Sequence, residues 1–75
     1  MKGRHAVQQE RERILNEITT KVTALRTARQ SSCWADVPSL EAAIWTLRRR
    51  AVAEGCSPGA IRAALEAGEE STNSV

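Results

Sequence analysis

Residues 7–25 read VQQERERILNEITTKVTAL, and the spacing of the apolar residues in this stretch indicates the fold class. At about 100° per residue, its large apolar side chains fall within an arc of about 100°, which one face of a helix can bury. These side chains are Val7, Ile14, Leu15, Ile18, Val22 and Leu25. No glycine or proline interrupts the pattern. We therefore predict a long helix over residues 5–30 with one side facing a core.

A second helix is predicted over residues 39–54. Residues 30–37 favour a loop, because Pro38 disfavours helix just before it. Ser39 is expected to cap the start of the helix, and Gly55 suits the left-handed position that follows its end. The apolar face of this helix consists of Leu40, Ile44, Leu47 and Ala51.

A third, shorter helix is predicted over residues 58–67. Ser57 is a suitable N-cap, and Pro58 fits the first helical position. Gly68 is expected to end the helix. The inner face consists of Ile61, Ala64 and Leu65.

These elements predict an all-α fold, a small three-helix domain over residues 1–68 with a disordered C-terminal tail over 69–75. The two shorter helices together are about as long as the first. In one arrangement they continue each other along the long helix, with a kink at Gly55–Ser57. In the other, the third helix turns aside, and the N-terminal turns of the first pair with a second copy.

Size and charge restrict the class of protein. Residues 1–30 carry a balance of +4 and residues 31–75 a balance of −2, giving +2 overall. No apolar run is long enough for a membrane span, and no apolar stretch follows the basic N-terminus, so a cytosolic chain is expected. So short a chain builds a small core, which makes a homodimer a reasonable expectation. The excess of arginine and alanine suggests a bacterial or phage gene.

Nothing in the sequence indicates catalysis. His5 has no carboxylate or nucleophile near it in sequence, and no glycine-rich phosphate loop is present. Cys33 and Cys56 flank the second helix, whose length keeps them too far apart for an intramolecular disulfide. Two cysteines and one histidine cannot complete a tetrahedral zinc site. We therefore expect no enzyme activity, no cofactor, no metal and no small-molecule substrate.

The first functional hypothesis is a non-catalytic regulatory or adaptor protein that binds a protein partner or itself. Tryptophan and arginine are the residue types in which interfaces concentrate their binding energy. The second helix carries such residues beside its core face, and a further tryptophan precedes it. The predicted protein-binding residues are Trp34, Trp45, Arg48, Arg49 and Val52. The alternative is that Trp45 closes the core against the third helix.

The second hypothesis is DNA binding. Residues 48–68 read RRRAVAEGCSPGAIRAALEAG, and the spacings of Ala51, Gly55 and Ile61 match the small residue, turn glycine and core aliphatic of a helix-turn-helix. The stretch thus resembles that motif, with Ser57–Ala67 in place of the recognition helix. This resemblance implies a transcription regulator that contacts DNA through Arg48, Arg49, Arg50, Ser57 and Arg62.

Overall fold

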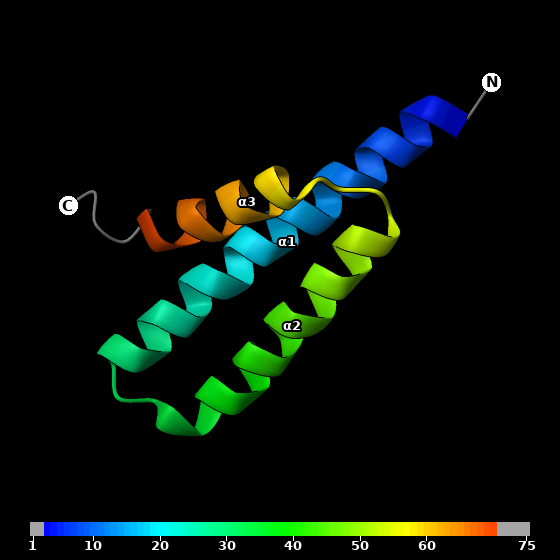
Figure 1. Ribbon diagram of the computed structural model, residues 1–75. Coiled ribbons are helices and arrows are strands. Elements are labelled where there is room, and N and C mark those ends of the chain that lie inside the picture. The colour runs from blue at the N-terminus through cyan, green and yellow to red at the C-terminus, as the bar shows by residue number, and fades with distance from the viewer. Residues whose placement is uncertain (1–2, 71–75) are drawn as a thin grey trace.

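The computed structural model describes residues 3–70 of the chain, with side chains from residue 7 onward. This part contains three α-helices and no strand (Figure 1). They are α1 (Gly3–Gln30), α2 (Val37–Ala53) and α3 (Pro58–Glu70), with a short 3-10 turn, η1 (Trp34–Asp36), before α2. The predicted all-α, three-helix fold is therefore confirmed.

The apolar stripe of α1 forms the centre of the core. Ile14 and Ile18 are 2% and 0% exposed, and Val22 is buried beside them. Their partners on α2 and α3 are Ile44, Leu47, Ala51, Ile61 and Ala64. Val7 belongs to the same stripe but is exposed. The reason is that the first turns of α1 project beyond the other two helices (Figure 1).

The start of α2 differs from the prediction. The helix begins at Val37, with Asp36 at the N-cap, so Ser39 lies inside the first turn and is not the cap. Pro38 did not prevent helix at Val37. A proline is tolerated in the first turn because its missing N–H group has no partner there. Residues 30–37 were predicted to form a loop. In the structure the last four of them form the 3-10 turn (Trp34–Asp36) and the first residue of α2.

The end of α2 agrees with the prediction. Gly55 has a φ of +91°. The backbone N–H of Cys56 donates to the carbonyl of Ala51 at 2.9 Å, and that of Gly55 donates to Val52 at 3.0 Å. These two bonds form a Schellman motif, which reverses the chain after a helix. Cys56 is buried and Cys33 is exposed, and both are free thiols.

The helix α3 does not continue the line of α2. Its N-cap is Ser57, whose Oγ accepts a hydrogen bond from the backbone N–H of Ala60 at 3.1 Å, as predicted. It then runs along α1 in the same direction: the hydroxyl of Thr19 donates to the carbonyl of Ala64 at 2.9 Å, and that of Thr23 to Gly68 at 3.2 Å. The arrangement with a kinked second arm was thus wrong, because the Schellman motif turns the chain back.

The prediction that Gly68 ends the third helix was also wrong. Gly68 lies inside α3, which extends to Glu70, and it is buried against α1. A β-carbon on Gly68 would lie 2.6 Å from Cβ of Val22 and 2.8 Å from the carbonyl oxygen of Thr19. The glycine therefore allows close approach of two helices. Glu69 and Glu70, expected in the tail, are helical, while residues 71–75 lie outside the described part.

None of the helices within residues 3–70 combines the length and the apolar character that crossing a membrane requires.

Candidate interaction groove

An open groove of about 630 Å³ lies between α2 and α3. Both helices pack on α1 far more than on each other. They also diverge from their connection at residues 54–57 (Figure 1). The residues that line it are Trp45, Arg48, Arg49, Val52, Pro58, Ile61, Arg62 and Leu65.

The helical period explains why α2 contributes these residues. Its core face turns Ile44, Leu47 and Ala51 towards the centre of the fold. Trp45 and Val52 each follow a core residue by one position, so they lie about 100° further round the helix. They are 59% and 64% exposed. Trp45 is therefore too exposed to close the core against α3, as the alternative required.

The helix α3 provides the other wall. Ile61 is buried among the core residues but also borders the groove, and Leu65 is half-buried one turn later. Pro58 marks the end nearest the connection. The wall that α3 contributes to the groove is thus apolar along two helical turns, and it borders the same groove as the apolar side chains of α2.

Three arginines surround this apolar surface. The guanidinium carbon of Arg49 lies 5.1 Å from the centroid of the Trp45 ring, the geometry of a cation–π contact. Within the described residues, no carboxylate pairs with Arg48, Arg49 or Arg62. Among the residues whose side chains the structure describes, no acidic one lines the groove either. The groove therefore has apolar walls and a positively charged rim.

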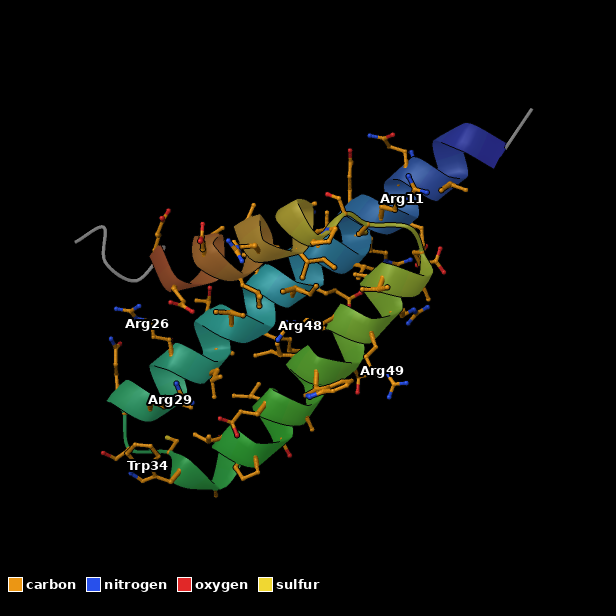
Figure 2. The ribbon with its side chains drawn as sticks, viewed as in Figure 1. Arg11, Arg26, Arg29, Trp34, Arg48 and Arg49 are labelled. Carbon is orange, nitrogen blue, oxygen red and sulfur yellow. The ribbon has the colours of Figure 1, made fainter. Side chains whose placement is uncertain are left out.

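The structure brings together four of the five residues predicted to bind protein. Trp45, Arg48, Arg49 and Val52 all line the groove. Trp34 does not, because it lies in η1 at the connection between α1 and α2 (Figure 2). It is 61% exposed there. Trp34 and Trp45 therefore do not form one surface.

The five residues predicted to contact DNA lie on different parts of the structure. Arg48, Arg49 and Arg62 line the groove. Nη2 of Arg50 lies 4.0 Å from a carboxylate oxygen of Glu10 on α1, so this arginine belongs to a different face. The hydroxyl of Ser57 is occupied as the N-cap of α3. A single face that presents all five residues is not formed.

The sequence placed Ile61 and Leu65 on the core face alone, and it placed Pro58 only at the first position of the third helix. Their place on the groove depends on the path of α3 across α1, and no local sequence signal gives that path. The spacing of Pro58, Ile61 and Leu65, at three and four residues, did place them on one side of the helix. It did not indicate that this side also meets the flank of α2.

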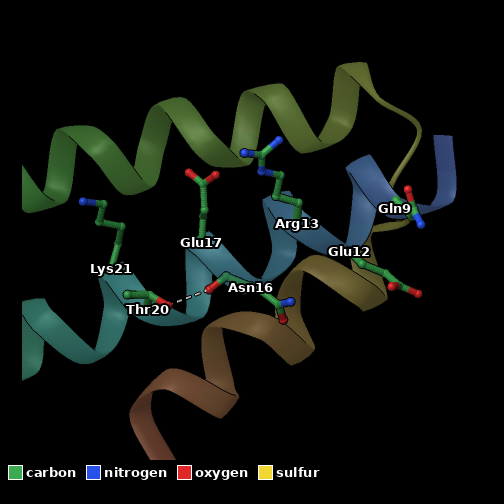
Figure 3. Close-up of a pocket in the computed structure, with 7 residues that line it drawn as sticks. All are labelled: Gln9, Glu12, Arg13, Asn16, Glu17, Thr20 and Lys21. Atoms are coloured by element: carbon green, nitrogen blue, oxygen red, sulfur yellow. Dashed lines mark hydrogen bonds between the residues drawn. The ribbon is translucent and has the colours of Figure 1, made fainter. Parts of the chain in front are cut away.

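A second hollow, of about 580 Å³, lies on the outer face of α1 (Figure 3). Its lining is entirely polar: Gln9, Glu12, Arg13, Asn16, Glu17, Thr20 and Lys21. The hydroxyl of Thr20 donates to the backbone carbonyl of Asn16 at 3.0 Å, so it serves its own helix. No cluster of three or more metal-ligating side chains occurs in the part of the chain that the structure describes.

Comparison with protein-family models, with curated proteins and with solved structures finds no match to this chain.

Proposed function

We propose that this chain is a non-catalytic regulatory or adaptor protein of the cytosol that binds a protein partner in the groove between α2 and α3. The observation that carries the proposal is the exposure of Trp45 and Val52 beside Ile61 and Leu65. An exposed apolar surface ringed by polar groups is a common feature of protein interaction sites. The free thiols of Cys33 and Cys56 are compatible with the reducing cytosol.

The aromatic anchor strengthens this reading. Tryptophan and arginine are the residue types most enriched among interface residues whose truncation is costly. Here Arg49 lies over the Trp45 ring, so the indole is held partly in place before a partner arrives. A side chain that is already ordered loses less conformational entropy on binding.

The test is site-specific photo-crosslinking of the full chain in its host cell. A photoreactive amino acid replaces Val52 in the groove or, as a matched control, Asn16 on the polar outer face of α1. We expect a protein adduct that resists nuclease at position 52 and none at position 16. Equal adducts at both positions, or none at position 52, would contradict a protein-binding groove.

Duplex DNA is the second candidate. It is supported by Arg48, Arg49 and Arg62, which come from two helices and have no carboxylate partner among the described residues. The exposed side of α3 also carries Ala63, Glu66 and Ala67. These residues offer DNA no donor pair of the kind that reads a base edge.

Salt dependence separates the two candidates. If three phosphates were neutralised, the logarithm of the affinity for duplex DNA would fall with the logarithm of salt concentration at a slope of about −2.7. An interface centred on Trp45 should respond weakly to salt. Nuclease-sensitive adducts at position 52, together with the steep slope, would favour DNA over a protein partner.

A further inference from the structure

We propose that the occupant of the α2–α3 groove is an acidic amphipathic helix of another protein. This inference rests on the proposed function and adds the chemistry of the partner. It follows from the shape of the groove, from the charge at its rim and from the mismatch between the groove and the faces of a second copy.

The walls of the groove favour a helical occupant. Both walls are helices, and no strand occurs within residues 3–70, so the described part offers no sheet edge to which an extended peptide can add. The lining residues on α2 run from Trp45 to Val52 and those on α3 from Pro58 to Leu65. Seven residues of helix rise by about 10.5 Å, or two turns. That length suits a helix with apolar anchors at positions i, i+4 and i+7.

The charge at the rim favours an acidic occupant. Arg48 and Arg49 lie on one wall and Arg62 on the other, and the described part of the chain places no acidic side chain in the groove. Carboxylates that flank the apolar anchors of a docked helix would meet guanidinium groups on both sides. Arginine is suited to this role because its planar group holds a carboxylate with two hydrogen bonds.

A second copy of the chain does not match this groove. A symmetric dimer through the groove would bring Arg48, Arg49 and Arg62 against the same residues of the other copy, and like charges at an interface are unfavourable. The outer face of α1 carries Glu12 and Glu17, but Arg13 and Lys21 balance their charge and all the side chains that line it are polar. That face therefore cannot supply an amphipathic helix in which carboxylates flank apolar anchors.

The test is selection from a displayed library of helices. Every member carries leucine at i, i+4 and i+7, and the flanking positions vary among Glu, Gln and Lys. The bait is the full chain, with its helical content checked by circular dichroism. We expect the selected helices to carry Glu more often than Lys by about tenfold, which corresponds to about 1.4 kcal/mol.

Two variants with the same change in net charge show whether the rim is responsible. The double variant Arg48→Glu, Arg62→Glu alters the groove, whereas Arg13→Glu, Lys21→Glu alters the outer face of α1. We expect the first to select Lys over Glu and the second to keep the preference for Glu. Trp45→Ala, which removes the aromatic anchor, should abolish enrichment of any helix.

Several results would overturn the inference. One such result is that the unaltered chain selects helices rich in Lys, or shows no preference between Glu and Lys. Another is that both double variants change this preference in the same way. Failure to enrich any helix also rejects a helical occupant, while a protein adduct at position 52 would leave the proposed function standing. A dimer in sedimentation that Trp45→Ala dissociates would assign the groove to a second copy. Competition by duplex DNA with the steep salt slope would assign it to nucleic acid.

Discussion

The Nε atom of Arg11 donates a hydrogen bond of 2.7 Å to the backbone carbonyl of Glu54, 43 residues further along the chain. The acceptor lies at the C-terminal end of α2, where backbone carbonyls lack helical partners and the helix dipole is negative. The same guanidinium occupies the space beside Gly55, where Nη2 lies 2.5 Å from the position of a β-carbon. Arg11 thus links α1 to the turn that connects α2 with α3.

Arg11→Met should lower the free energy of unfolding by about 1.5 kcal/mol, because it removes a charged donor from a partly buried carbonyl. Arg13→Met is the matched control. Arg13 is exposed on the outer face of α1, so its replacement should change stability by less than about 0.5 kcal/mol. Urea unfolding of both variants measures the difference, and equal effects would show that the bond to Glu54 does not stabilise the turn.

Two glycines of α3 should respond to alanine with opposite signs. Gly68→Ala places a methyl group 2.6 Å from Cβ of Val22, which should separate α1 from α3 and cost about 2 kcal/mol. A β-carbon on Gly59 meets nothing within 4 Å, so Gly59→Ala should stabilise by about 0.5 kcal/mol through helix propensity. Thermal unfolding compares the two, and stabilisation by Gly68→Ala would contradict the close helix approach.

A single substitution just after the end of α1 should stabilise the fold. Ser32 has a φ of +61°, and the N–H of Cys33 donates to the carbonyl of Ala28 at 2.8 Å, as in a Schellman motif. A glycine is the favoured residue at such a position, so Ser32→Gly should stabilise the fold by about 1 kcal/mol. Ser31→Gly should instead destabilise it, by about 0.5 kcal/mol, because its φ is not positive. Denaturant midpoints test both signs.

The two thiols should differ in reactivity. Cys33 is exposed and Cys56 is 8% exposed within the core. In the native state an aromatic disulfide reagent should modify Cys33 rapidly and Cys56 slower by roughly a hundredfold or more, since Cys56 reacts only when the structure opens. Cys33→Ser should leave only the slow phase. Similar native rates for both thiols would mean that Cys56 is not in a stable core.

The helices were predictable because the sequence features that indicate them act over short distances along the chain. The apolar stripe around Ile14 and Ile18 follows from the helical period alone. Gly55 and Ser57 each act through backbone groups within a few residues. The direction of α3 was not predictable in this way. It depends on bonds such as that from Thr19 to Ala64, whose partners are 45 residues apart.

The same distinction applies to single residues. A glycine near the end of a helical pattern favours a stop, and only the contact of Gly68 with Val22 shows its packing role. On the groove, Trp45 and Val52 were identified because they lie beside a recognisable core face. Ile61 and Leu65 join them only through the path of α3, and Trp34 is set apart by the turn that contains it.

The order of the helices along α1 has a consequence for assembly of the groove. Arg29 and Glu41, which bridge α1 and α2, are 12 residues apart, whereas Thr19 and Ala64, which join α1 and α3, are 45 apart. Closing the longer loop costs about 1.2 kcal/mol more in chain entropy. Pairing of α1 with α2 is therefore favoured first, and the groove between α2 and α3 acquires its second wall only when α3 docks.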